Sequence, residues 1–336
     1  MLTLVLLTPD LHADNLRGNH SIITQYSTRQ YKGSRQIWDI AQGKDGLVYF
    51  IAGDIIQHGD NHWMAIPNQF GNVLRSIHSV SPDSLLVGGA SLIGMVVKKE
   101  IPGKHQFVSL MPKLDEAYHD FGSVWDFQKS PQGYYIRAGK ALLHYKVDQD
   151  TIVPLITGQI IEQMHRSGDS LLVQSRNKGL EIWHEKELKG LPGGDFFKQK
   201  TIKGIFSLEN GRMMAITGNS GIFILEGGQI RALDAPIHQI LSKMGVEDAC
   251  RLSSNEFAIG TIKDGLYIIN KSGQVHEHIN KQNGLQNNTI LSLATDYKNN
   301  LWLGLDKGIA YVETSSEFSI LNSEDDIGTG YVSQEY

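Results

Sequence analysis

Residues 290–312 are Ile-Leu-Ser-Leu-Ala-Thr-Asp-Tyr-Lys-Asn-Asn-Leu-Trp-Leu-Gly-Leu-Asp-Lys-Gly-Ile-Ala-Tyr-Val. Two turns separate three short apolar segments here, the first at Asn299-Asn300 and the second at Gly308. The apolar segments are rich in Leu, Ile, Tyr and Trp, and Asn and Gly tolerate the positive φ of hairpin turns. The stretch therefore predicts three consecutive antiparallel strands.

The same pattern of apolar segments and turns recurs along the chain at a nearly constant interval. Weaker copies span residues 45–56, 83–97, 132–145, 169–183, 210–224 and 255–269. The residues that anchor the first turn of each copy are Gly46, Ser84, Gly133, Ser170, Gly211, Glu256 and Asn300, spaced by 37 to 49 residues with a mean near 42. A four-stranded blade needs about 40–45 residues, whereas helical tetratricopeptide and ankyrin units repeat near 33–34. We expect an all-β chain, a seven-bladed β-propeller of four-stranded antiparallel blades.

A single blade cannot bury both faces of its sheet, so the blades must pack on one another in a ring. The positions of the glycines fit this architecture. The glycine late in several copies is expected to make the second turn; these residues are Gly179, Gly221, Gly265 and Gly308. A small pair just before that turn, such as Gly260-Thr261, is expected to let adjacent blades approach closely.

The two ends of the chain carry separate expectations. Residues 1–13 are largely apolar and end in Leu-His-Ala, which favours the remnant of a secretory signal peptide, although a basic n-region is missing. The alternative is an apolar terminus that packs as a strand. We expect one propeller over residues 22–336. Residues 323–336 would either close the ring or begin a further unit of a longer protein.

Composition excludes several functional classes. The 336 residues include 31 Lys and Arg against 36 Asp and Glu, and hydrophobic residues make up 40%. A net charge of −5 without a basic stripe argues against direct contact with nucleic acid. The single cysteine rules out an intrachain disulfide. No apolar run approaches the ~18 residues that a membrane span needs.

Residues 287–309 resemble the two-component regulator propeller repeat, whose pattern is roughly Asn-x-Val-x-x-Ile-x-x-Asp-x-x-Gly-x-Leu-Trp-Ile-Gly-Thr-x-x-Gly-Leu. This copy departs from it at Asn300, where the pattern has Gly, and at Leu305, where it has Thr. Residues 36–42, 46–50, 59–63 and 121–126 are similar to a subset of these proteins from Bacteroidetes-type bacteria. The resemblance covers roughly residues 22–336, and the middle blades match least.

The resemblance implies the periplasmic sensor propeller of a regulator in the inner membrane. Such regulators continue with a three-tyrosine immunoglobulin-like domain, a membrane helix and a cytoplasmic output, either a LuxR-type helix-turn-helix or a histidine kinase. None of these parts lies within the 336 residues, so the resemblance implies a fragment of a longer protein. A homodimer is expected by analogy with transmembrane signalling.

Motifs for catalysis or metal binding are missing from the sequence. It contains neither the Gly-x-Ser-x-Gly elbow of α/β-hydrolases nor a P-loop. His58 and His62 fall in a Gly, Asp and Asn turn, which favours a solvated hairpin tip over a helical metal pair. His276 and His278 are expected on one exposed strand face. We expect no cofactor, no metal and no catalysis; a free-standing secreted or periplasmic binding propeller is the first alternative, and a propeller lyase or glycosidase the second.

The candidate ligand-binding residues are Trp38, Arg75 and Trp125. They occupy matching positions at the start of the first strand of three blades, in Ile-Trp-Asp, Leu-Arg-Ser and Val-Trp-Asp. That strand usually lies nearest the central axis, and Trp and Arg are typical binding residues. The alternative is that the tryptophans pack between blades. The expected ligand is a small molecule, and the resemblance to polysaccharide-utilisation regulators suggests an oligosaccharide.

Overall fold

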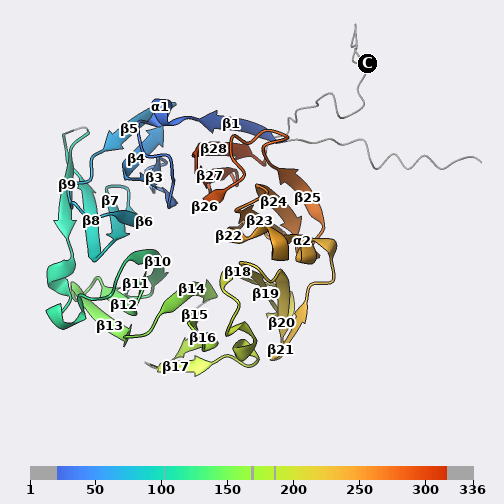
Figure 1. Cartoon of the computed structure of the whole chain (residues 1–336). Coiled ribbons are helices and arrows are strands. Elements are labelled where there is room, and N and C mark those ends of the chain that lie inside the picture. Colours follow the sequence, from blue (N-terminus) through green and yellow to red (C-terminus); the bar gives the residue numbers. More distant parts are fainter. Residues whose placement is uncertain (1–20, 102, 168–169, 185–186, 316–336) are drawn as a thin grey trace, which may run out of the picture.

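The structure, a computed structural model, describes residues 21–315 except 102, 168–169 and 185–186. In this part of the chain, 28 strands form seven antiparallel sheets of four strands each, and the sheets stand around a common centre as blades (Figure 1). The expected seven-bladed propeller is confirmed. The predictions for residues 1–13 and 323–336 fall outside the described residues.

The first four blades follow one another along the chain. Blade 1 contains β2 (Ile40–Gln42), β3 (Val48–Ala52), β4 (Asp54–Gly59) and β5 (His62–Ile66). Blade 2 contains β6 (Leu74–Ser81), β7 (Ser84–Gly89), β8 (Leu92–Lys98) and β9 (His105–Ser109). Blade 3 contains β10 (Val124–Ser130), β11 (Gly133–Ala138), β12 (Ala141–Lys146) and β13 (Thr151–Thr157). Blade 4 contains β14 (Ile161–Ser167), β15 (Ser170–Ser175), β16 (Gly179–His184) and β17 (Glu187–Gly190).

The remaining three blades complete the ring. Blade 5 contains β18 (Ile202–Ser207), β19 (Met213–Thr217), β20 (Ile222–Glu226) and β21 (Gln229–Ala232). Blade 6 contains β22 (Val246–Arg251), β23 (Glu256–Thr261), β24 (Leu266–Asn270) and β25 (Val275–Ile279). Blade 7 contains β26 (Ile290–Thr295), β27 (Leu301–Leu305), β28 (Gly308–Glu313) and β1 (Ile22–Tyr26). The helices are α1 (Thr28–Tyr31), α2 (Pro236–Met244) and the short 3₁₀ turns η2 (Met111–Lys113), η3 (Glu116–Tyr118), η4 (Gly194–Phe197) and η5 (Glu209–Gly211).

Blade 7 is built from both ends of the described chain, which closes the ring. β1 supplies its outermost strand and pairs antiparallel with β28, with Ile22 opposite Glu313 and Tyr26 opposite Ile309. A closed ring leaves only short sheet edges exposed, because the first and last blades are joined by a full strand ladder.

The core lies between neighbouring blades, and the first strand of each blade lies innermost (Figure 1). Small residues permit the contact. A Cβ atom on Gly260 of β23 would lie 2.6 Å from Cγ2 of Ile290 in the next blade, and one on Gly88 of β7 would overlap Val124 in the next. The prediction that the Gly260 position allows close packing of blades is confirmed. The second-turn glycines, Gly179, Gly221, Gly265 and Gly308, all have φ between +74° and +110°, as the turns require.

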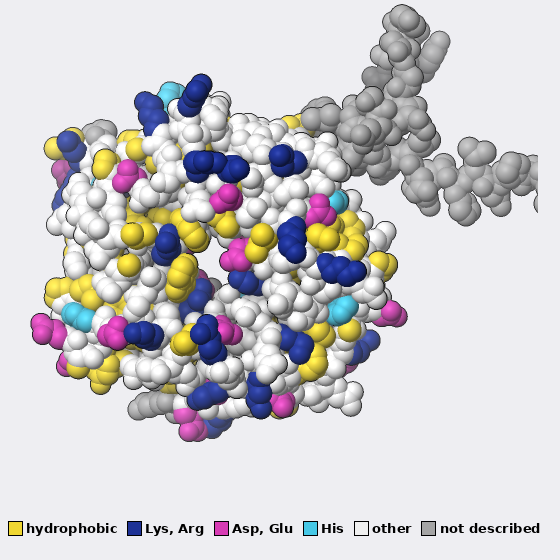
Figure 2. Space-filling view, in the orientation of Figure 1, with side chains coloured by type: hydrophobic (Ala, Val, Ile, Leu, Met, Phe, Trp, Pro, Cys, Tyr) yellow, Lys and Arg dark blue, Asp and Glu magenta, His cyan; other side chains and the backbone are white. Residues whose placement is uncertain are grey.

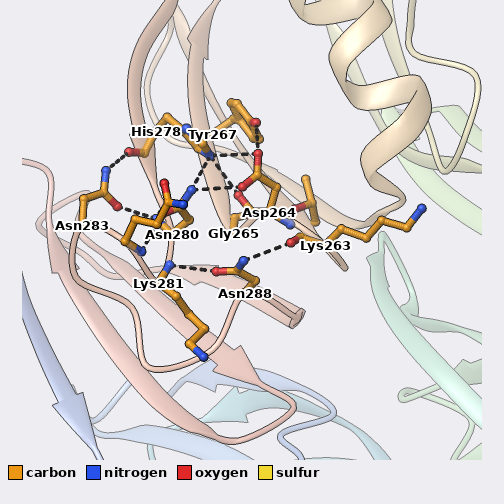
Figure 3. A network of polar contacts seen from close by, with 11 residues as sticks. Lys263, Asp264, Gly265, Tyr267, His278, Asn280, Lys281, Asn283 and Asn288 are labelled. Carbon is orange, nitrogen blue, oxygen red and sulfur yellow. Dashed lines mark hydrogen bonds and ion pairs between the residues drawn. The ribbon is translucent and has the colours of Figure 1, made fainter.

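A polar network holds the loop that leads from blade 6 to blade 7 (Figure 3). Asp264 accepts hydrogen bonds from the hydroxyl of Tyr267 at 2.5 Å and the side-chain amide of Asn280 at 3.0 Å. The ring of His278 stacks on Tyr267, with centroids 4.1 Å apart. Asn283 donates to the carbonyl of His278 at 2.7 Å. These contacts hold in place the loop that precedes β26.

Candidate functional site

The innermost strands share an irregularity at their first residues. In six blades the ladder between the first and second strand skips one residue, and these skipped residues are Arg75, Trp125, Glu162, Lys203, Glu247 and Leu291. In blade 1, Ile51 accepts from the backbone N–H of Trp38 and donates to the carbonyl of Asp39, both at 2.9 Å, so Trp38 holds the same place. A β-bulge of this kind redirects a side chain out of the sheet.

All seven bulge residues line one cavity of about 680 Å³ at the central channel. Figure 2 shows one face of the ring, where a hollow opens at the centre with hydrophobic, basic and acidic side chains around it. The cavity falls within the size range of small-molecule sites, roughly 300–1,000 Å³. The repeat therefore delivers one side chain per blade to the channel, and we call these seven residues the bulge ring.

Trp38, Arg75 and Trp125 meet in the bulge ring, as neighbours from blades 1 to 3. The guanidinium carbon of Arg75 lies 4.0 Å from the ring centroid of Trp38 and 5.8 Å from that of Trp125. Trp125 is 40% exposed, while Trp38 is partly buried and also packs against the core between blades 1 and 2. The sequence left open whether the tryptophans pack between blades. Trp38 does so, and the exposed ring of Trp125 does not.

The charged members of the bulge ring in blades 4 to 6 are paired. Glu162 accepts from Nε of Arg176 at 2.9 Å, and Nζ of Lys203 lies 3.1 Å from Glu247. Sequence reasoning did not single these residues out. Aligning each blade on Ile37-Trp38-Asp39 would have found them, because they fill the same position in less typical repeats.

A groove adjoins the cavity and shares Trp38 and Arg75 with it. Its other lining residues are Ser34, Arg35, Gln36, Gly53, Val73, Leu74 and Asp306. They come from the segments that lead into blades 1 and 2 and from the turns β3–β4 and β27–β28. Trp38 and Arg75 therefore stand where the channel opens onto the loops that connect the blades.

Three carboxyls lie just inside the bulge ring, and two of them tie neighbouring blades together. Asp39 accepts from the backbone N–H of Ile40 and, in the next blade, of Ile77, both at 2.8 Å. Asp248 accepts from Ala249 and, in the next blade, from Leu293, both at 2.8 Å. With both oxygens of each carboxyl engaged by backbone donors, Asp39 and Asp248 are structural groups. The third, Asp126, accepts from the amide of Gln128 at 3.2 Å.

Burial raises the pKa of all three carboxyls, that of Asp248 to about 6. For Asp39 the neighbouring Asp126 and Asp248 act in the same direction, while backbone hydrogen bonds oppose it. Each of these side chains keeps part of its surface open to the channel although protein surrounds it closely. Their ionisation therefore disfavours the folded state, by an amount that water in the channel reduces.

This raised pKa predicts a pH dependence of stability. A carboxyl whose pKa is about 6 when folded and near 3.8 when unfolded stabilises the fold fully below pH 4 and less as the pH rises to 6. We expect Asp248→Asn to flatten the fall in the free energy of unfolding between pH 4 and pH 6. Urea unfolding of both proteins at pH 4, 5, 6 and 7 measures this. An unchanged slope would show that Asp248 does not carry the effect.

Two further polar atoms in the cavity lack a hydrogen-bond partner among the described residues. They are Nε of Arg137 and Nε2 of His165. Arg137 donates through Nη1 to the carbonyl of Glu162 at 3.0 Å. Burial, assisted by the charge of Arg137, lowers the pKa of His165 to about 3, so this imidazole is neutral. Both atoms are buried in the wall of the cavity.

In each histidine pair one ring is exposed, and the other, His58 or His278, is covered by a neighbouring aromatic ring. The hairpin β4–β5 turns at Asp60 and Asn61 as expected, and His62 is exposed. The prediction was wrong for His58, which is 8% exposed and stacks on Trp63 with centroids 4.2 Å apart. The outer strands of blade 1 pack against β1 of blade 7, and this contact covers His58. His276 is exposed and bonds Glu256 at 2.7 Å.

Metal and membrane features were searched over the described residues. Within them, no three His, Cys, Asp or Glu side chains converge as a metal site would require. The helices of this part of the chain are too short or too polar to span a bilayer.

No family model and no curated protein matches the chain. Solved structures do match. The extracellular domain assigned to the hybrid two-component system BT3049 of B. thetaiotaomicron aligns with a TM-score of 0.64 and 14% identity, over 88% of this chain and 42% of that one. That of BT4673 from the same organism aligns with a TM-score of 0.67 and 15% identity, over 89% of this chain and 40% of that one.

The chain has their propeller fold. This agrees with the resemblance of residues 287–309 to the regulator repeat, and the chain spans 42% and 40% of the length of those two extracellular domains. Streptogramin B lyase is also similar, with a TM-score of 0.66 and 14% identity over 87% of this chain and 97% of the lyase. The fold is therefore shared by extracellular domains of signalling proteins and by an enzyme.

Proposed function

We propose that this propeller is the extracytoplasmic ligand-sensing domain of a bacterial signal-transduction or transcription regulator and that it binds a small molecule without transforming it. The observation that carries the proposal is the convergence of Trp38, Arg75 and Trp125 at the mouth of the central channel. An exposed indole beside a guanidinium that has no hydrogen-bond partner is typical of a binding surface.

An oligosaccharide fits this surface. An indole ring offers an apolar face to the C–H face of a sugar and leaves the sugar hydroxyls free for polar partners. Polar side chains that line the cavity, such as Gln128 and Gln163, supply such partners. The extracellular position of the BT3049 and BT4673 domains supports a location in the periplasm, as part of a protein in the inner membrane.

The structural role of Asp39 and Asp248 supports a non-catalytic reading. A glycosidase needs two carboxyls free to exchange protons with the substrate or attack it. Here both carboxyls are committed to backbone N–H groups of two blades. A lyase remains the alternative that the similarity to streptogramin B lyase suggests, and turnover of a bound ligand would favour it.

Signalling would follow from movement of the propeller as a unit. Ligand can shift a signalling equilibrium only through different affinities for two states. Closure of the ring by β1 and the ties between blades favour rigid-body movement over rearrangement within the ring. The partners in that movement would be segments outside this chain that tether it to the membrane, and a second copy in a homodimer.

The location is tested in the source bacterium. Antibodies against residues 21–315 are used on periplasmic, membrane and cytoplasmic fractions. We expect the protein in the membrane fraction, accessible to protease added to spheroplasts. Protein recovered from the cytoplasm and protected from protease would contradict the sensor proposal, and protein free in the periplasm would favour the free-standing binding propeller.

Binding is tested by removing the tryptophans. We expect Trp38→Ala and Trp125→Ala each to weaken binding by about 5- to 150-fold, because stacking with an aromatic ring contributes about 1–3 kcal/mol. Binding is measured on a glycan array of plant, bacterial and animal oligosaccharides, followed by tryptophan fluorescence titration of each hit. Trp183→Ala, on β16 away from the channel, is the matched control and should bind like the natural protein. Equal losses in all three variants would exclude the channel mouth as the site.

A further inference from the structure

Arg75 is the unneutralised charge of the bulge ring. Among the described residues, no carboxylate and no carbonyl accepts a hydrogen bond from its guanidinium, whose contacts are the two indole rings. The other three charged members of the ring are neutralised, Glu162 by Arg176 and Lys203 with Glu247. A partly buried cation without a counter-ion is unfavourable, and burial lowers the pKa of Arg75 accordingly.

The geometry leaves the guanidinium open to an anion. A carbon 4.0 Å from the centroid of Trp38 fits a guanidinium whose face covers the indole. Its N–H groups have no hydrogen-bond acceptor among the described residues. The planar fork of a guanidinium matches the two oxygens of a carboxylate or sulfate in a bidentate contact. The indoles thus hold the arginine in place and leave its donors free.

The nearby carboxyls do not occupy this position. Both oxygens of Asp39 are engaged by the backbone of Ile40 and Ile77. Asp126 lies next to Arg137. Burial raises the pKa of Asp126, and the charge of Arg137 lowers it. Farther in, Nε of Arg137 is a second donor without a partner among the described residues. Arg75 therefore offers free N–H donors to the channel, whereas the unpartnered Nε of Arg137 is buried.

We propose that the ligand is an acidic sugar, whose anionic group pairs with Arg75 while its ring stacks on Trp38 or Trp125. This rests on the proposed function and names the ligand class of the same site. A carboxylate and a sulfate share this chemistry. A neutral sugar would leave the arginine unpaired in the bound state, more deeply buried than in the free protein.

The test compares three trisaccharides by isothermal titration calorimetry at low and high salt. They are trigalacturonic acid, its fully methyl-esterified form and a sulfated galactan trisaccharide. Proteins are the natural chain, Arg75→Gln, Arg75→Lys and the control Arg231→Gln. Arg231 is an exposed arginine on β21 that pairs with Glu226 at 3.8 Å, far from the channel. Near-ultraviolet circular dichroism verifies that each variant is folded.

We expect the natural chain to bind one of the two anionic sugars at least tenfold more tightly than the ester, with affinity that falls as salt rises. Arg75→Gln should abolish this preference, Arg75→Lys should keep part of it because the charge remains without the fork, and Arg231→Gln should keep all of it. Preference for the acid or for the sulfated sugar identifies the anionic group.

Equal binding of acid, ester and sulfated sugar, lost on Trp38→Ala and unaffected by Arg75→Gln, would overturn the acidic-sugar inference and leave the proposed function intact. Failure of all three sugars to bind would also overturn it. The glycan array, which does not depend on charge, then decides separately whether the channel mouth binds sugars at all.

Discussion

Gly265→Ala is expected to lower the free energy of unfolding by about 2–5 kcal/mol. Gly265 turns the chain between β23 and β24 with φ of +74°. An alanine there adds the strain of a left-handed conformation, roughly 1–2 kcal/mol. Its Cβ would also overlap the carbonyl oxygen of Ile279 and lie 2.9 Å from Cα of Asn280. Backbone on both sides must shift, and overpacking of this kind adds about 1–3 kcal/mol.

The matched control is Gly46→Ala. Gly46 has φ of +84°, and a Cβ there would meet no atom within 4 Å. It should therefore show the conformational strain alone, roughly 1–2 kcal/mol. Urea unfolding followed by circular dichroism measures both variants. Equal losses in the two would mean that the crowding around Ile279 relaxes freely, although the hydrogen bonds in Figure 3 hold this loop.

Tyr26→Ala is expected to lower the free energy of unfolding by about 2–4 kcal/mol and to loosen the closure of the ring. Tyr26 lies on β1, the outer strand of blade 7. Its ring centroid is 4.9 Å from that of Trp63 and 5.6 Å from that of His58, both in blade 1, and 5.9 Å from that of Trp302 in blade 7. One side chain thus joins the first and last blades.

Two controls separate the ring contact from other effects. Tyr26→Phe keeps the aromatic contacts and should change stability by less than about 1 kcal/mol, because no described residue bonds the hydroxyl. Gln25→Ala removes the exposed neighbouring side chain, which donates to the carbonyl of Gly284, and should also have a small effect because this hydrogen bond is exposed to solvent. Hydrogen exchange of the β1–β28 amides should accelerate in Tyr26→Ala alone. If exchange rises equally in all three variants, β1 and not the tyrosine ring governs closure.

Much of the fold and part of the site were accessible from sequence. Hairpin turns leave a local signature in Asn and Gly, and the blade period follows from that signature, so the seven blades could be counted from residues 45 to 312. Trp38, Arg75 and Trp125 were found because their residue types stand out at one repeat position. Glu162, Lys203 and Glu247 fill the same position with ordinary surface residues, so nothing in composition distinguished them.

The sequence by itself determined the number of blades and the turn residues, because the turn signature depends on neighbours a few residues apart and recurs once in each blade. The tertiary structure alone decided which strand closes the ring, since β1 and β28 pair across almost the whole length of the chain. It also decided the burial of His58 and the pairing of Lys203 with Glu247. Such contacts join residues of different blades, and a repeat pattern does not indicate which side chains of two blades contact each other.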